Sequence, residues 1–299
     1  MSAAEAPVSG GLDGSSDSPA ALEAHGITVR FGGLVALNDV SIAVPPASIV
    51  GLVGPNGAGK TTLFGVLSGL LRPQAGDVFL GGRKVTHAAP SKRARLGLAR
   101  TFQQLELFMG LTVREHLVLG YRIRHTRRRL WSDLVTAGAL HRPSREEDAR
   151  VDHLLDLLAL TSVADTAAAS LPLGTSRRVE VARALATGPS VVLLDEPSSG
   201  LDHHETAQLG GALRSVVDEE RVSLLFVEHD VAMVLGLSSQ VAVLDFGVRI
   251  AYGTPDEIRN DPAVRAAYLG DDEAVEGTHE TPPATAPAEA SAPAEGGEA

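Results

Sequence analysis

Short apolar runs alternate with helical patterns between residues 22 and 270, and this alternation is typical of an α/β fold. The run at 49–53 ends in a glycine-rich turn, and the residues after that turn, 60–68, have a helical pattern. Continuous apolar runs at 191–194 and 224–227 predict strands that are buried on both faces of a parallel sheet. The pattern therefore predicts a buried sheet whose strands are connected by helices.

Other segments have a different pattern. A strand with one buried face is predicted by three apolar residues that alternate with polar or small ones, Ile27, Val29 and Phe31. Between residues 112 and 185 the pattern is helical, and Ser144 followed by Glu147 predicts a capping box. Thr254 followed by Pro255 predicts another helix start. We therefore expect a mostly helical block inserted between two halves of an α/β core.

The composition of the two ends predicts disordered tails. Residues 1–21 and 271–299 are rich in small and polar residues and almost lack large apolar ones, so they cannot bury enough surface to offset the entropy of ordering. The net charge of −11 lies in these tails, which contribute three and eight acidic residues and no Lys or Arg. The remaining 26 acidic and 26 basic residues balance, so a general nucleic-acid binder is not indicated.

The composition also excludes several kinds of chemistry and placement. The chain has no cysteine, which excludes disulfides, thiolate nucleophiles and cysteine metal ligands. The N-terminus lacks the basic and apolar regions of a secretory signal. No apolar run approaches the roughly 18 residues that a membrane helix needs, so we expect a chain that does not span a membrane.

The candidate phosphate loop matches the pattern G-x-x-x-x-G-K-[ST] between a predicted strand and a predicted helix. Its residues are Gly54, Pro55, Asn56, Gly57, Ala58, Gly59, Lys60 and Thr61, with Thr62 following. Glycines let consecutive backbone N–H groups point at phosphate oxygens, and the helix N-terminus adds the positive end of its dipole. Lys60 is expected at the β- and γ-phosphates, and the Thr61 hydroxyl on Mg²⁺. The loop therefore predicts binding of ATP with Mg²⁺.

Two adjacent carboxylates end the apolar run at 191–194. We expect Asp195 to reach the Mg²⁺ ion and Glu196 to polarise the water that attacks the γ-phosphate. His229 and Gln103 also follow predicted strands, and ligands bind at such strand ends in open α/β sheets. A histidine at a strand end is more commonly a structural hydrogen-bonding residue, so its position alone leaves its role open.

These elements, in this order and spacing, resemble the ABC ATPase family over nearly all of residues 22–270. The resemblance implies that Phe31 stacks on adenine, with an ordinary core aromatic as the alternative. It implies that Gln103 contacts Mg²⁺ and couples to a permease, and that His229 is a catalytic contact of the γ-phosphate. The run Ser199-Gly200-Leu201-Asp202 resembles the loop that crosses to a partner subunit, which places Asp202 at the shared nucleotide.

The resemblance also implies the architecture. The fold class is α/β, a RecA-like P-loop NTPase core of the ABC type with an antiparallel β subdomain and an inserted helical subdomain. The α/β core takes residues 22–103 and 186–253, the helical insert takes 104–185, and C-terminal helices take 254–270.

The family's signature, Leu-Ser-Gly-Gly-Gln, is altered here to Leu171-Pro172-Leu173-Gly174-Thr175. Pro172 replaces the serine whose hydroxyl reaches the γ-phosphate bound by the partner subunit. Gly174 and a helix beginning near Thr175 are expected to face that phosphate with backbone N–H groups. Because loss of one hydrogen bond to a charged group costs about 1.5–3 kcal/mol, we expect attenuated hydrolysis and not its loss.

Four strings resemble the branched-chain amino acid importer ATPases within that family, residues 29–37, 100–103, 253–262 and 267–270. The resemblance implies an ATP-hydrolysing subunit that powers import of branched-chain or other hydrophobic amino acids, or of related small solutes. Its partners are then a second ATPase subunit, identical or different, membrane permeases and, indirectly, an extracytoplasmic solute-binding protein. Its expected place is the cytoplasmic face of the cell membrane, as a peripheral protein.

Two alternatives stay open. An ATPase of a lipid or other exporter would share every catalytic residue. A soluble, non-transport ABC protein that acts on ribosomes or DNA usually has two ATP cassettes or a long coiled-coil insertion. One phosphate loop and an insert of ordinary size favour the transporter.

An arginine-rich segment ends at Trp131 and contains no acidic residue. Its five arginines are Arg122, Arg124, Arg127, Arg128 and Arg129. It indicates either a solvated helical face or contact with anionic lipid headgroups, with Trp131 at the interface. Nucleic-acid binding ranks last, because only Tyr121 and Trp131 are nearby to stack on bases.

Overall fold

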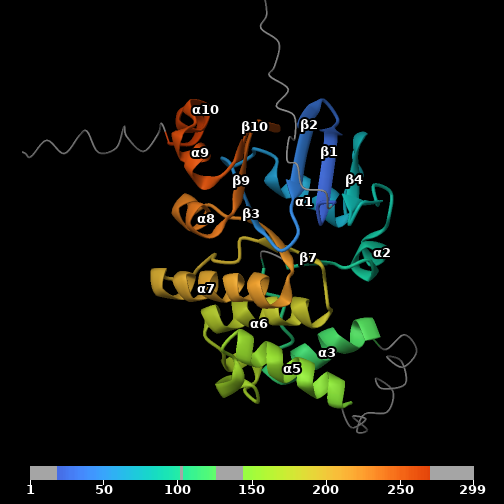
Figure 1. The fold of residues 1–299 in the computed structure, drawn as a ribbon, viewed down its shortest axis with the longest axis vertical. Coiled ribbons are helices and arrows are strands. Elements are labelled where there is room, and N and C mark those ends of the chain that lie inside the picture. Colours follow the sequence, from blue (N-terminus) through green and yellow to red (C-terminus); the bar gives the residue numbers. More distant parts are fainter. Residues whose placement is uncertain (1–18, 102–103, 126–143, 270–299) are drawn as a thin grey trace, which may run out of the picture.

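The computed structural model describes residues 19–101, 104–125 and 144–269 (Figure 1). Gln103, most of both predicted tails and four residues of the arginine-rich segment, Arg127, Arg128, Arg129 and Trp131, lie outside these ranges. Ala21 ends the predicted N-terminal tail, yet its N–H donates to the Val44 carbonyl at 2.9 Å, so ordered structure begins before residue 22. Among the described residues, no helix is both long and apolar enough to cross a membrane.

A six-stranded sheet forms the centre of the described structure. In spatial order its strands are β10 (Val248–Gly253), β9 (Gln240–Asp245), β3 (Ile49–Val53), β8 (Ser223–Val227), β7 (Val191–Asp195) and β6 (Leu98–Arg100). Neighbouring strands are parallel except for β9 and β10. Because the carboxyl ends of parallel strands meet at one edge, this order brings together the residues that follow β3, β8 and β7.

The central strands are buried on both faces, as their continuous apolar runs predict. Every residue of β3, β7 and β8 is buried. Val191 and Leu193 of β7 pack into the core that holds α1 (Lys60–Ser68), whereas Val192 and Leu194 pack into the core of the helices α6 (Leu173–Ala186) and α7 (His203–Glu220). The sheet therefore separates two hydrophobic cores.

A second, antiparallel sheet packs over α1. Its spatial order is β2 (Leu34–Val44), β1 (Leu22–Phe31), β4 (Ala75–Leu80) and β5 (Arg83–Lys84), and α2 (Pro90–Arg95) follows it in the chain. Ile27 and Val29 of β1 are buried together with Leu63 and Phe64 of α1, so α1 fills the space between the two sheets. The predicted half-buried strand is confirmed.

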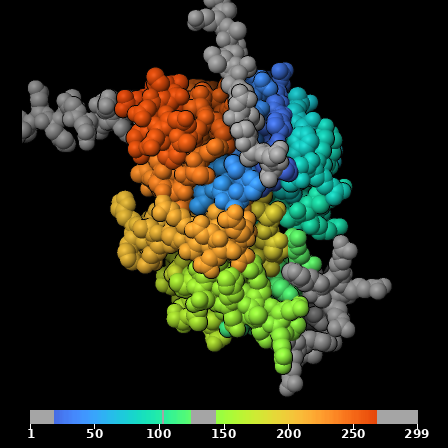
Figure 2. Space-filling view, viewed as in Figure 1, coloured from blue at the N-terminus to red at the C-terminus, as the bar shows by residue number. Residues whose placement is uncertain are grey.

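The helical block lies at the lower end of the molecule in Figures 1 and 2. It contains α3 (Val113–His125), α5 (Arg145–Leu157), the short turns η1 (Thr161–Val163) and η2 (Ala168–Ser170), and α6. Ser144 caps α5 as predicted, by accepting from Glu147 N at 3.1 Å. The second hydrogen bond of a capping box, from the Ser144 N–H to the Glu147 carboxylate, is wrongly predicted. That carboxylate instead pairs with Arg122 at 2.7 Å. The Arg122 side chain is thus partly buried, 17% exposed, and is paired within the helical block.

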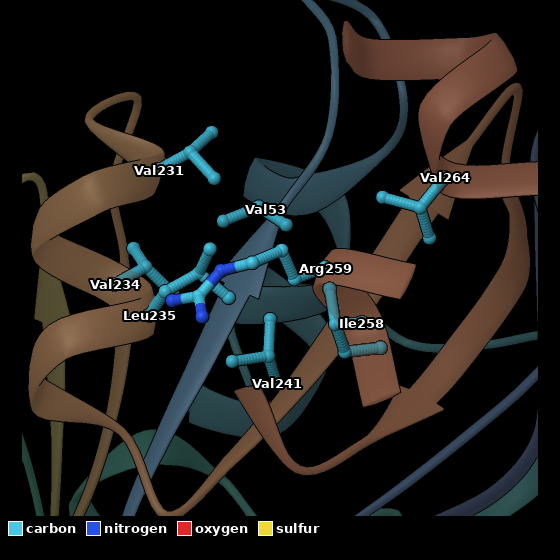
Figure 3. A pocket seen from close by; sticks show the side chains of 8 residues that line it. All are labelled: Val53, Val231, Val234, Leu235, Val241, Ile258, Arg259 and Val264. Carbon is cyan, nitrogen blue, oxygen red and sulfur yellow. The ribbon is translucent and has the colours of Figure 1, made fainter. Parts of the chain in front are cut away.

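The C-terminal elements pack beside α8 (Val231–Leu237). They are α9 (Pro255–Asn260), α10 (Pro262–Val264) and the π-helical turn η3 (Arg265–Leu269). Thr254 and Glu257 form a capping box, with Pro255 in the first turn, which confirms the predicted helix start. A small pocket between α8 and α9 is lined by apolar side chains and by Arg259 (Figure 3). None of the described candidate site residues lines it, so it is a gap between packed elements.

These elements confirm the predicted α/β class, with a parallel core sheet, an antiparallel β subdomain and an inserted helical subdomain. The insertion is visible in the topology, because α3, α5 and α6 lie in the chain between the adjacent strands β6 and β7.

Arg93 of α2 is fully buried and ties the C-terminus of α1 to the rest of the fold. Its guanidinium donates to the carbonyls of Val66 and Leu67, both at 2.6 Å, and to that of Thr86 at 2.9 Å. Burial lowers the pKa of Arg93 to about 10. The last carbonyls of a helix lack partners within it, so the guanidinium satisfies groups at the end of the phosphate-loop helix.

We expect Arg93→Lys to lower the free energy of unfolding by about 2–4 kcal/mol, because one ammonium does not reproduce the planar fork that reaches four carbonyls, that of Ala88 included. Urea unfolding of the full chain measures this change. Arg95→Lys, which alters an exposed residue of the same helix, is the matched control and should change stability by less than about 0.5 kcal/mol. Equal effects of the two substitutions would contradict the role given to Arg93.

Candidate active site

The predicted phosphate loop connects the end of β3 to the start of α1 at the carboxyl edge of the core sheet. Gly54, Gly57 and Gly59 have positive φ values of 151°, 83° and 102°. A Cβ on Gly54 would lie 2.1 Å from the Leu244 carbonyl oxygen, and one on Gly59 would lie 2.7 Å from the Ala36 carbonyl oxygen. Close backbone approach therefore requires both glycines, and the loop is held between β9 and β2.

Lys60 is the first residue of α1, and its ammonium group lies within the loop. Its Nζ donates to the Gly54 carbonyl at 2.5 Å and to the Pro55 carbonyl at 3.0 Å. Burial lowers the pKa of Lys60, and the negative charge of Glu196 partly offsets this shift. Gly59 at the N-cap has no side chain to satisfy the first N–H groups of α1, so amide donors and an ammonium converge on one place. Such a site favours an anion.

Glu196 and His229 meet beside the loop. Glu196 follows β7 with a φ of 47°, which is strained for a residue other than glycine, and its N–H donates to Val227 of β8 at 3.0 Å. His229 Nε2 lies 2.9 Å from Glu196 Oε1, and the His229 side chain is 48% exposed. Since Glu196 also acts electrostatically on Lys60, the structure brings the three predicted catalytic residues together.

Asp195, the predicted metal ligand, is the last residue of β7 and is 8% exposed. Its Oδ2 accepts from Arg100 Nη2 at 2.8 Å, and Arg100 Nη1 donates to Ser68 Oγ at 3.0 Å. Arg100 is not among the site residues predicted from the sequence. The feature of the sequence that could have indicated its role is its position at the end of β6, the strand that pairs with β7. Arg100 thus fixes the Asp195 carboxylate relative to the end of α1.

Glu228 is a second residue that the sequence analysis missed. It is 3% exposed, and its Oε1 accepts from Ser198 N at 2.7 Å. Burial raises the pKa of Glu228, and the nearby Glu196 carboxylate adds to this shift, whereas the N–H donors of Ser198 and His229 act in the opposite direction. Through this hydrogen bond the Glu228 carboxyl group ties the loop after Glu196 to the end of β8, just before His229. The feature that could have indicated this role is the position of Glu228 directly after the apolar run at 224–227.

The other predicted contacts divide between the loop and β1. Phe31 is the last residue of β1 and is 50% exposed, so the alternative of an ordinary core aromatic is wrong. Asn56 is exposed at the tip of the loop, and Thr61 and Thr62 lie in the first turn of α1, where Thr61 is exposed. The side chains of Phe31, Asn56 and Thr61 are therefore open to solvent. Gln103 lies outside the described residues.

Gly174, Thr175 and Asp202 belong to a neighbouring cluster. The helix expected to begin near Thr175 is α6, which starts at Leu173 with Pro172 at the N-cap position. A Cβ on Gly174 would lie 2.8 Å from Glu205 Oε1. Asp202 and Glu205 form the capping box of α7, with Asp202 Oδ1 accepting from Glu205 N at 2.8 Å. Packing within this chain thus accounts for Gly174, and helix capping accounts for the Asp202 side chain.

Comparisons with known proteins identify the family. A family model described as "ABC transporter" matches residues 37–199, more than half of the chain, so this chain belongs to the ABC transporter family. It is one of the nucleotide-binding ATPases of that family, and the ABC type of the fold is confirmed. A second model, described as "Branched-chain amino acid ATP-binding cassette transporter", matches residues 248–274.

The relatives fit the same assignment. The high-affinity branched-chain amino acid transport ATP-binding protein BraF of Pseudomonas aeruginosa is 38% identical over 84% of this chain and 98% of its own length. LivG of Escherichia coli, with the same description, is 37% identical over the same shares. The ADP conformation of MJ1267, an ATP-binding cassette of an ABC transporter, superposes with a TM-score of 0.73 at 27% identity, covering 84% of this chain and 99% of MJ1267.

The buried Glu228 generates a testable pH dependence. Its pKa in the folded chain is raised above the unfolded value, so its contribution to stability is fully present below the unfolded pKa and is lost as pH rises through the folded pKa. Glu228→Gln keeps an acceptor for Ser198 N and removes the titration. Relative to the original chain, we expect this variant to gain stability as pH rises from about 4 to about 8.

Urea unfolding at the two pH values measures the difference. Glu219→Gln removes an exposed carboxylate from α7 and controls for the loss of one charge. A stability difference between Glu228→Gln and the original chain that is the same at both pH values would rule out a raised pKa.

Proposed function

We propose that this chain binds and hydrolyses ATP with Mg²⁺ to power import of branched-chain or other hydrophobic amino acids, or of related small solutes. The observation that carries the catalytic part is the convergence of Lys60, Glu196 and His229 at the ends of three adjacent strands, next to a loop built for an anion. Each of the three has a distinct role in the proposed reaction.

The phosphate loop binds the β- and γ-phosphates with its backbone N–H groups, and Lys60 adds its charge. Glu196 polarises the attacking water, because its carboxylate lies beside the loop and remains 16% exposed. His229, hydrogen-bonded to Glu196, orients that carboxylate and contacts the γ-phosphate. The exposed ring of Phe31 stacks on adenine.

The available donors fit a Mg²⁺ ion. Thr61 and Asp195 offer hard oxygen atoms, and we assign Gln103 as a further ligand. Among the described residues no group of three or more His, Asp or Glu side chains could hold a metal ion. Bound Mg²⁺ neutralises charge on the β- and γ-phosphates. Arg100 holds the Asp195 carboxylate in place for this purpose.

We place a second ATPase subunit, identical or different, against the nucleotide, contributing its Gly174–Thr175 region and the loop that ends at Asp202. The first-turn N–H groups of α6 supply donors there, whereas Pro172 supplies none, so hydrolysis is attenuated. Membrane permeases bind the pair at the cytoplasmic face of the membrane, and an extracytoplasmic solute-binding protein delivers the cargo to them.

The proposed cargo class rests on the relatives. BraF and LivG are described as branched-chain amino acid transport proteins, and the match at 248–274 is to a model of the same description. That match favours an importer over an exporter, which would share the same catalytic residues. A single cassette and coverage of nearly the whole length of BraF favour a transporter subunit over a non-transport protein.

The variant Glu196→Gln tests both parts of the proposal. It keeps the size of the side chain and removes the base, so we expect Mg·ATP binding to stay within about three-fold and turnover to fall about 10²–10⁴-fold. In cells that carry the variant as their only copy, uptake of radiolabelled leucine should fall in parallel. Asp218→Asn, an exposed site on α7, controls for charge.

Turnover near that of the original chain would remove Glu196 from the reaction. Lost turnover with normal uptake of leucine, isoleucine and valine would leave the ATPase in place and contradict the cargo.

A further inference from the structure

The turn between β9 and β10 holds an aromatic side chain that the proposed function does not use. Phe246 and Gly247 form a two-residue hairpin loop, since Asp245 and Val248 pair directly. Both loop residues have positive φ, 41° for Phe246 and 78° for Gly247. Asn or Gly suits such a turn, and a bulky aromatic is an outlier there. The Phe246 side chain is also 88% exposed. Phe246 therefore costs stability through its backbone and gains little from burial.

This turn is fixed against the phosphate loop. Gly247 N donates to the Ala58 carbonyl of the loop at 3.0 Å, and the Gly247 carbonyl accepts from Asn38 N of β2 at 2.8 Å. A Cβ on Gly247 would lie 2.7 Å from the Ala36 carbonyl oxygen, the same atom that approaches Gly59. The position of Phe246 is thus set relative to the loop by direct backbone contacts, without a flexible segment between them.

The same strand, β2, connects this turn to Phe31. Phe31 of β1 pairs with Leu34, the first residue of β2, only two residues before Ala36. The first two residues of β2 are apolar and exposed, with Leu34 68% and Val35 39% exposed. Phe31 and the turn that carries Phe246 therefore both contact the N-terminal half of β2 through their backbones.

We propose that Phe246 is a second aromatic contact for the nucleobase and helps this chain to prefer a nucleotide over a bare polyphosphate. The inference rests on the proposed function, because it places the phosphates on the loop and the base toward Phe31. A base has two faces, and aromatic side chains stack on either one without hydrogen-bond readout. An exposed ring with little conformational freedom in its backbone is suited to this contact, because little ordering entropy is lost on binding.

The substitution Phe246→Asn tests the proposal in the full chain. Asn suits the left-handed position, so the variant should fold and keep or raise the thermal unfolding midpoint. We expect its affinity for Mg·ATP to fall about ten-fold, equivalent to about 1.4 kcal/mol, the scale of one base–aromatic stack. Its affinity for Mg·tripolyphosphate, which lacks a base, should stay unchanged. Both affinities are measured by titration calorimetry.

Two matched variants complete the experiment. Phe246→Tyr keeps the ring and should bind ATP like the original chain. Arg221→Asn relieves backbone strain at another left-handed position, the residue after α7, which has a φ of 56°. It should change the affinity for neither ATP nor tripolyphosphate.

Two results would overturn the inference. The first is ATP affinity that is unchanged in Phe246→Asn; if association of the ATPase subunits weakens at the same time, Phe246 is a subunit contact. The second is an equal loss of affinity for ATP and for tripolyphosphate, which would mark a structural effect on the loop. If the original chain binds neither ligand, the proposed function itself fails.

Discussion

The backbone of the phosphate loop lies directly against the backbones of β2 and β9, and the rest of the site depends on this contact. Only glycine permits it, since a Cβ at Gly54 would meet a carbonyl oxygen at 2.1 Å. The contact fixes the loop between the two sheets and directs the first turn of α1 toward the carboxyl edge. Lys60 is then buried, and its ammonium group donates to the loop carbonyls. There its electrostatic attraction for an anion is strengthened, because little water screens the charge.

The order of the parallel strands supplies the other groups. β8 lies between β3 and β7, so the residues after β7 and β8 reach the loop from adjacent strands. Glu196 occupies a strained backbone conformation at this junction, and the hydrogen bond of its N–H to Val227 holds it there. Strain of this kind persists only where the surrounding structure imposes it. Here the buried Glu228 contributes, because it anchors Ser198 immediately after the strained segment.

Much of this arrangement could be predicted from the chain alone. Continuous apolar runs identified the buried strands, and the loop pattern located Lys60, because both depend on local residue types. Arg100 and Glu228 were missed, since their roles come from contacts across 95 and 30 residues of sequence. The predicted hydrogen bond from the Ser144 N–H to the Glu147 carboxylate is wrong for the same reason, because Arg122, distant in sequence, pairs with that carboxylate. α6 starts at Leu173 with Pro172 at its N-cap position, and Pro172 makes no side-chain cap hydrogen bond. Domain boundaries and the roles of single site residues stay predictions.

The central claim is that the loop around Lys60 binds the terminal phosphates of a nucleotide. The most direct measurement is calorimetric titration of the folded full chain with Mg·ATP, beside Lys60→Ala and the exposed control Lys92→Ala. The account predicts saturable binding by the original chain and by Lys92→Ala. For Lys60→Ala it predicts affinity lower by about 100-fold, the scale of a lost hydrogen bond to a charged group. Well-folded original chain that takes up no Mg·ATP, or equal affinity of Lys60→Ala, would contradict it.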